Sequence, residues 1–236
     1  MEQNMSARTR AHGSIRFPNF TAFLKTAAAW TALVAAALVP HAALAASSTI
    51  VISQIYGAGN NSGASYQNDY VELFNLTGSP VSVSGWSVQY ASATGTGNFS
   101  ANGAVALSGT IPAGGYYLVK LAGGTTTGAP LPNADASGSI NMSGTAGKVL
   151  VANVSTGLAC NGGSAPCSAA QLAQIVDLIG YGTGATGANF FEGSAAAPTI
   201  SATLADFRAA NGCTDTDNNS ADFSSITPSI FSLACC

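Results

Sequence analysis

The sequence has 236 residues, of which 47% are hydrophobic and only 7% are charged, and its formal net charge is −3. So few cations exclude a basic stripe of the kind that neutralises phosphates in sequence-independent nucleic-acid binding, and we expect no direct nucleic-acid partner. The apolar fraction is ordinary for a globular protein, and the length suits one domain with a real core once an N-terminal leader is set aside.

The first element in chain order is a predicted export signal over residues 1–45. A positively charged leader precedes an uncharged apolar run, residues 26–39, that is shorter than the roughly 20 residues of a membrane span. Pro40 and the small residues after it suit a signal peptidase, and we predict cleavage between Ala45 and Ala46. An uncleaved membrane anchor is the alternative. Cleavage would give a secreted, periplasmic or cell-envelope protein with no membrane span after processing.

Removal of this leader takes away both histidines, His12 and His41. The remaining chain has three cations against nine acids, which gives a formal charge of 3 − 9 = −6. Without a histidine there is no Ser-His-Asp relay, and the sequence contains no Gly-x-Ser-x-Gly nucleophile elbow. These absences argue against hydrolysis by a nucleophilic serine.

From Thr49 onward, short apolar runs are separated by glycine-rich breaks, a pattern typical of an all-β sandwich. In the run DYVELFN, Val71 and Leu73 share one face, as strand alternation requires. The segment 201–210 is predicted to be a turn or a single-turn helix. We predict at least six strands, within residues 49–56, 69–75, 81–90, 116–121, 147–154 and 174–182.

Two acids in predicted strands, Glu72 and Asp177, each stand between apolar residues. Paired carboxylates are the catalytic groups of glycoside hydrolases, but alternation allows each acid to face solvent or a backbone donor, and we favour these structural roles. Trp86 and the tyrosines could stack on a sugar or a base, although core packing is the commoner role and the one we expect. No catalytic residue is predicted.

All five cysteines follow the leader, where export allows disulfides to persist. Cys160 and Cys167 bracket the turn-forming stretch NGGSAP, and we predict that they pair. Cys213 would then pair with Cys235 or Cys236, and the remaining thiol would allow a disulfide-linked dimer. Zinc is the competing use, but a cysteine-only site needs four thiolates in close paired spacing, and no histidine is available.

The stretch CTDTDNNSADF is the most site-like part of the sequence. Asp215, Asp217 and Asn219 follow the alternate spacing of a calcium loop, but Ser220 replaces the glycine of an EF-hand at the sixth position, and Ile226 replaces its glutamate at the twelfth. An EF-hand is therefore excluded, whereas a less regular calcium site is left open, with Asp222 as an added ligand. The alternative, which we favour, is that these side chains cap their own backbone in tight turns.

Several stretches taken together resemble a bacterial lamin tail domain: DYVELFN and SGWSVQY at their observed separation, then IPAGGYYLV, IVDLIGYG and GCTDTDNNSADF. The resemblance runs from about residue 49 to residue 223. It implies an immunoglobulin-like β-sandwich without catalytic activity, found in exported bacterial proteins and often placed ahead of an extracellular nuclease or phosphatase-type domain. Where similar sequences continue with P-x-P-R-N-S, this one reads TPSIFSLACC over residues 227–236.

The predicted organisation is a signal peptide at 1–45, an all-β, immunoglobulin-like sandwich of lamin tail type at 46–226, and an atypical C-terminal tail at 227–236. We expect an exported, non-catalytic binding or structural module whose partner is an unknown protein or a cell-surface or extracellular ligand. The alternative is an accessory N-terminal module, or a truncated fragment, of a secreted nuclease or phosphatase-type hydrolase. No cofactor is expected apart from the calcium candidate.

Overall fold

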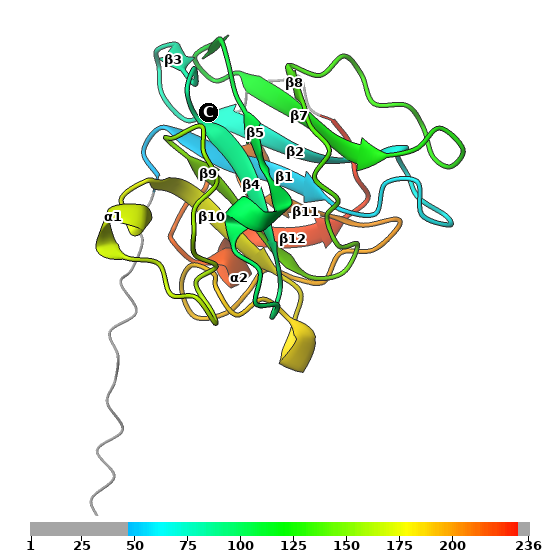
Figure 1. The fold of residues 1–236 in the computed structure, drawn as a ribbon. Helices are drawn as coiled ribbons and strands as arrows, with labels where there is room; N and C mark the ends of the chain where they lie inside the picture. The colour runs from blue at the N-terminus through cyan, green and yellow to red at the C-terminus, as the bar shows by residue number, and fades with distance from the viewer. Residues whose placement is uncertain (1–46, 231–236) are drawn as a thin grey trace, which may run out of the picture. The chain divides into compact units, whose positions relative to one another are not determined.

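Two β-sheets, one of six strands and one of four, pack face to face in the computed structural model, which describes residues 47–230 (Figure 1). Neighbouring strands of the larger sheet pair antiparallel, except β7 and β8, which run parallel. From edge to edge, this sheet contains β12 (Phe223–Ile226), β11 (Ala205–Arg208), β1 (Ile50–Tyr56), β2 (Asn68–Asn75), β7 (Tyr116–Gly123) and β8 (Ala136–Ser137).

The smaller sheet is antiparallel throughout and is accompanied by a two-stranded ribbon and single-turn helices. Its order is β10 (Ile175–Tyr181), β9 (Gly147–Ala152), β4 (Ser87–Ser92) and β5 (Ala104–Ala106), and the ribbon pairs β3 (Val81–Ser82) with β6 (Thr110–Ile111). The helices of residues 47–230 are α1 (Ala169–Leu172), α2 (Asn219–Asp222) and 3-10 turns at Phe99–Asn102, Gly184–Thr186 and Ala210–Gly212. The predicted all-β sandwich is confirmed. None of these helices has the length and apolar character of a membrane span.

The main hydrophobic core fills the space between the two larger sheets. It is built from inward side chains of β1, β2 and β7 on one side and of β4, β9 and β10 on the other. In β1, a bulge between Ile52 and Gln54 inserts an extra residue, so that Ile50, Ile52 and Ile55 all face this core. Strict alternation would have turned Gln54 inward and Ile55 outward.

The outer faces of both sheets are covered as well. Tyr56, Tyr70 and Leu118, which alternate with core residues, pack outside the six-stranded sheet together with Leu131 and Ile230. The outside of the four-stranded sheet packs against a loop that a disulfide closes. Because β1 is enclosed on both faces, all of its residues are buried, and its sequence IVISQIY is a nearly continuous apolar run.

Two predicted elements differ from the structure. The run at 81–90 is not one strand, because a turn at Gly85, whose φ is +86°, separates β3 from β4. The predicted turn or single-turn helix at 201–210 is wrong where Ala205–Arg208 form β11, which pairs with β1 and β12. The pattern concealed this strand because its inward positions, Asp206 and Arg208, are charged instead of apolar.

Candidate functional site

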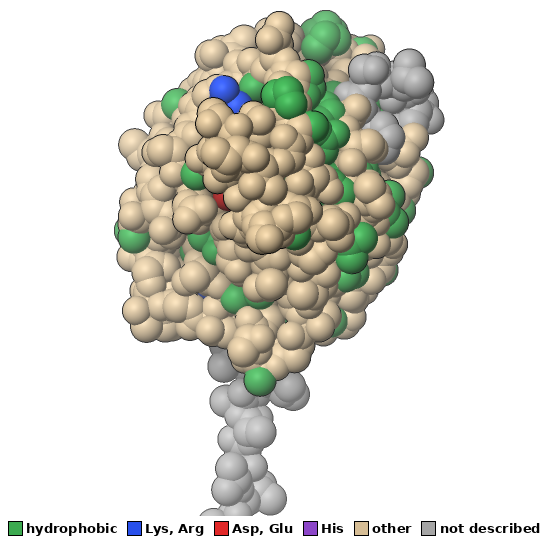
Figure 2. Space-filling model, turned by 90° about the vertical axis from the view of Figure 1, so that its right-hand side faces the viewer, with side chains coloured by type: hydrophobic (Ala, Val, Ile, Leu, Met, Phe, Trp, Pro, Cys, Tyr) green, Lys and Arg blue, Asp and Glu red, His purple; other side chains and the backbone are tan. Residues whose placement is uncertain are grey.

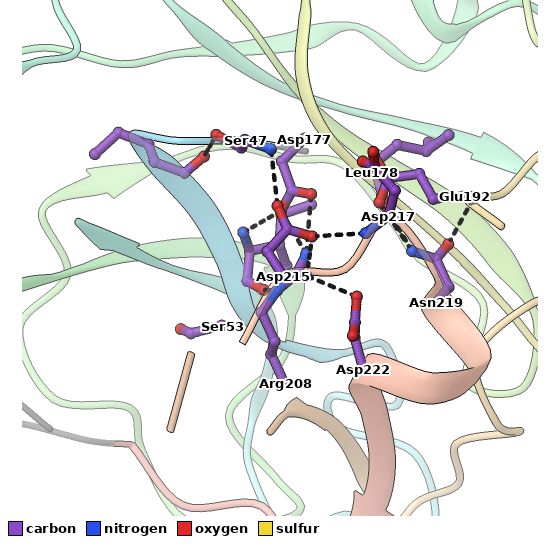
Figure 3. A network of polar contacts seen from close by, with 12 residues as sticks. Ser47, Ser53, Asp177, Leu178, Glu192, Arg208, Asp215, Asp217, Asn219 and Asp222 are labelled. Carbon is purple, nitrogen blue, oxygen red and sulfur yellow. Dashed lines mark hydrogen bonds and ion pairs between the residues drawn. The ribbon is translucent and has the colours of Figure 1, made fainter. Parts of the chain in front are cut away.

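A buried arginine, Arg208, joins the two sheets at one end of the sandwich (Figure 3). From the end of β11, its Nε donates to the carbonyl of Ile52 in β1 at 2.8 Å. Its Nη2 reaches across to β10 and donates to both carboxylate oxygens of Asp177, at 2.9 and 2.8 Å. The guanidinium also lies 4.6 Å from the ring centroid of Phe223 in β12. This side chain of β11 therefore contacts two further strands of the larger sheet, β1 and β12, and the edge strand β10 of the smaller sheet.

The remaining nitrogen of this guanidinium faces the acidic loop. Nη1 donates to Asp215 Oδ1 at 2.8 Å and to the carbonyl of Thr214 at 3.4 Å, and it lies 3.5 Å from Asp222 Oδ2. The second oxygen of Asp215 accepts the backbone N–H of Ser47 at 2.8 Å. The loop is thus attached to the interior of the sandwich by charge-assisted hydrogen bonds, which are stronger than neutral ones.

Asp222 organises the tight turn in front of it. Its Oδ1 accepts the hydroxyl of Thr216 at 2.7 Å, and its Oδ2 accepts the backbone N–H groups of Thr216 at 2.9 Å and Asn218 at 3.3 Å. Within this turn Asp217 has a φ of +54°, in the left-handed region that aspartate tolerates better than most residues. These contacts are the backbone capping that the sequence analysis favoured over calcium binding.

Asn219 closes the outer edge of β10. Its Oδ1 accepts the N–H of Gly180 at 2.8 Å, and its Nδ2 donates to the carbonyl of Leu178 at 2.9 Å. In an antiparallel sheet, a neighbouring strand would supply an acceptor for the Gly180 N–H and a donor for the Leu178 carbonyl. The amide also accepts the N–H of Glu192 at 3.2 Å and donates to its carboxyl at 3.1 Å. The side chain therefore does what one residue of a neighbouring strand would do.

The network holds more carboxyl groups than cations. Four acids surround Arg208, and burying ionised groups without partners is more unfavourable than their hydrogen bonds are favourable. Burial raises the pKa of Asp177 to about 6, although Arg208 opposes the rise. Burial and the neighbouring Asp177 raise the pKa of Glu192 to about 10, so Glu192 holds its proton at neutral pH. The four are Asp177, Glu192, Asp215 and Asp222.

Part of this cluster has the spacing of a cation site. One carboxylate oxygen each from Asp177, Glu192 and Asp215 lies within 4.8 Å of the others. Of the four predicted calcium ligands only Asp215 is in this group, while Asn219 and Asp222 use their oxygens to accept hydrogen bonds from the protein. Calcium binding stays a prediction. The sequence analysis missed Glu192 and Arg208, and the only available signal was that Arg208 is one of three cations after the leader.

The structure does not pair Glu72 with Asp177. Glu72 is fully buried on the outer face of β2, where its carboxylate accepts the hydroxyl of Ser53 at 3.0 Å. Asp177 points the other way, into the space between the sheets, where it accepts the N–H of Ile52 and the hydrogen bonds of Arg208. The six-stranded sheet lies between the two carboxylates, which excludes a shared cleft in this conformation.

The aromatic residues considered as a stacking platform serve packing. Trp86 is partly buried against the main core. Tyr56, Tyr66 and Tyr70 pack against one another with ring centroids 5.5–6.2 Å apart. Tyr70 donates its buried hydroxyl to Gln54, so the one polar atom of that ring is satisfied by the protein.

The predicted Cys160–Cys167 disulfide is present, with an S–S distance of 2.07 Å. Beside it the buried Lys148 donates from Nζ to the carbonyl of Asn161 at 2.8 Å and to Asn189 Oδ1 at 2.9 Å, and burial lowers the pKa of this amine to about 8. The other predicted sites, Cys235 and Cys236 as partners of Cys213 and the Ala45–Ala46 cleavage point, lie outside the described residues and stay predictions.

The architecture defines an immunoglobulin-like β-sandwich. The sequence profile of the Lamin Tail Domain family matches residues 43–181, more than half of the chain, and the chain belongs to this family. Among solved structures, it is similar to the crystal structure of a DUF4876 family protein from Bacteroides thetaiotaomicron VPI-5482, with 10% identity, a TM-score of 0.49, and coverage of 78% of this chain and 72% of that one. Comparison with curated proteins found no match. Of the charged residues in the buried network, only Asp177 lies within the family match.

Proposed function

We propose that this chain is an exported, non-catalytic binding or structural module. The observation that carries the proposal is that the charged side chains most suggestive of a site are buried and bonded to the protein itself. Arg208 and the acids around it are buried, and their hydrogen bonds join the two sheets. Catalytic acids and bases need access to a substrate, and within residues 47–230 these groups face the protein instead.

Export is supported by the leader pattern and by the Cys160–Cys167 disulfide. Structural disulfides persist in secreted and periplasmic proteins and are rare in reducing compartments. N-terminal sequencing of the protein from culture medium or periplasm tests this part directly. We expect the mature protein to begin at Ala46, and an intact Met1 would contradict export by a cleaved signal.

The absence of catalysis is tested with the purified protein on phosphodiester and phosphomonoester substrates and on oligosaccharides, each with magnesium, manganese or calcium added. We expect no turnover above buffer. Turnover that Asp177→Asn or Glu72→Gln abolishes while the folded state is retained, as judged by circular dichroism, would overturn the proposal. Association with a secreted hydrolase stays a prediction, and copurification of such an enzyme from the producing cell would support it.

A further inference from the structure

A groove of about 700 Å³ opens beside β7 and β8, at the edge of the six-stranded sheet. Its floor includes Lys120 of β7 and Ser137 of β8, which are paired in the sheet register. The rest of its lining consists of amide and hydroxyl side chains, glycines, two prolines, Leu131 and Ala134, and it includes neither a carboxylate nor an aromatic ring. The face of the molecule in Figure 2 is likewise mostly neutral, with blue and red covering only small areas.

Lys120 is the one cation of residues 47–230 whose side chain is not buried, since Arg208 and Lys148 are 1% and 0% exposed. All ion pairs in this part of the chain involve Arg208, and its lysine hydrogen bonds come from Lys148. Two acids directly follow lining residues in the sequence. Asp135 accepts the N–H of Leu118 at 2.8 Å, and Asp69 accepts the N–H groups of Gly59 and Met142, each at 2.8 Å. A half-exposed ammonium thus stands in a concave site without a protein counterion.

The walls of the groove are held in place by the fold. The N–H of Gly124 donates to the carbonyl of Gln67 at 2.9 Å, and Ala129 exchanges hydrogen bonds with residues 65 and 67. The side-chain oxygen of Asn60 accepts the N–H groups of Thr126 at 3.1 Å and Thr127 at 3.0 Å. Because these contacts order the loop before any ligand arrives, binding would cost little conformational entropy.

The chemistry of the lining favours one ligand class. The groove contains one cation, Lys120, which can pair with one negative charge on a ligand. A ligand with several negative charges would be repelled by the protein, which has nine acids and three cations after the leader. Nucleic acid needs several cations along its backbone. Sugar sites depend on aromatic platforms, which this lining lacks. Amides, hydroxyls and a short edge strand can hydrogen-bond to an extended peptide backbone.

We propose that this groove binds an extended peptide segment that carries one carboxylate. The carboxylate pairs with Lys120, while side chains such as Asn133 and Ser137 hydrogen-bond to the peptide backbone. This inference rests on the proposed function as a binding module and names its partner class.

The test uses an array of capped decapeptides of small polar residues, synthesised as twins with one central glutamate or glutamine, beside uronic-acid oligosaccharides. We expect the wild-type protein to bind glutamate members at least fivefold more tightly than their glutamine twins. Lys120→Gln should lose about tenfold in affinity for the glutamate members, and Lys120→Arg should keep most of it. Ala113→Glu, in the exposed turn before β7, changes the net charge as much as Lys120→Gln and should bind like the wild type.

Equal binding to both twins, the absence of any binding member, or unchanged affinity in Lys120→Gln would overturn the proposal, as would binding to the oligosaccharides alone. Thermal unfolding of each variant separates lost contact from lost folding, because Lys120 is at the surface and its substitution should leave the midpoint unchanged. Turnover of a substrate in the assays above would contradict the proposed non-catalytic function. An array without binding would contradict only the peptide-binding role of this groove.

Discussion

Arg208 and Lys120 show two opposite uses of a cation in the same sheet. Arg208 is enclosed by carboxylates and backbone carbonyls, with none of its charge available to a partner molecule. Lys120 stands in a groove whose lining has no carboxylate. In a chain with three cations after the leader, this contrast separates the part that holds the sandwich closed from the part that can recognise another molecule.

The largest effect should come from removing the guanidinium. Arg208→Met leaves the buried carboxylates uncompensated, and we expect the free energy of unfolding to fall by about 3–5 kcal/mol. Urea denaturation measures the change. Lys120→Met is the control and should shift the same free energy by less than about 0.5 kcal/mol. Similar losses in the two variants would contradict the structural role of the Arg208 network.

The pH dependence of stability should follow the buried acids. Burial raises the pKa of Asp206 to about 7 and that of Asp69 to about 7. Between pH 4 and 7 the folded state therefore holds protons that the unfolded state has released, so stability is greatest at low pH and falls as pH rises toward 7. Asp206 alone should contribute about 2–3 kcal/mol between pH 5 and pH 8.

Asp206→Asn tests that contribution, because Oδ2 of Asp206 is buried without a hydrogen-bond partner among the described residues and only Oδ1 accepts the hydroxyl of Ser225. In the wild type, the free energy of unfolding should be higher at pH 5 than at pH 8. In the Asp206→Asn variant this difference should be smaller by about the 2–3 kcal/mol assigned to Asp206. A profile identical to that of the wild type would show that Asp206 titrates normally.

Asn219→Ala should cost about 2 kcal/mol, since it leaves the Gly180 N–H and the Leu178 carbonyl of β10 without their partner. Ser220→Ala, at the exposed neighbouring position, is the matched control and should change stability by less than about 0.5 kcal/mol. Hydrogen exchange of the Gly180 amide gives a local readout, which should accelerate in Asn219→Ala and remain slow in Ser220→Ala.

The smallest expected effect is that of calcium. Because Arg208 already contacts Asp177 and Asp215, and Glu192 holds a proton, millimolar calcium should leave the thermal midpoint unchanged. A clear rise that Glu192→Gln abolishes would instead establish the cation site formed by these three acids.

Local patterns predicted the strands well where the inward positions were apolar. The alternation of Val71 and Leu73 placed β2, and the short turn-forming loop between Cys160 and Cys167 identified a disulfide. Strand β11 was missed because its inward residues are charged, and their partners include residues far along the chain, such as Asp177 for Arg208 and Ser225 for Asp206.

The candidate site could be predicted only in part for the same reason. The acidic loop and its capping role were visible in the sequence, because an aspartate that caps a turn contacts residues nearby in the chain. The choice of Arg208, Asp177 and Glu192 as its neighbours depends on how the sheets pack, and no local pattern encodes that packing.

The contacts of Arg208 also determine when, during synthesis, this part of the sandwich can form. Its bond to Ile52 spans 156 positions of the chain, and the bond from Ile52 to Asp177 spans 125. The first cannot form until residue 208 has been synthesised and the second not until residue 177, so both contacts form late in the synthesis of the chain. Contacts between residues so far apart in the sequence favour slow folding. A shortened chain that stops at residue 181 would lack β11, the strand that carries Arg208.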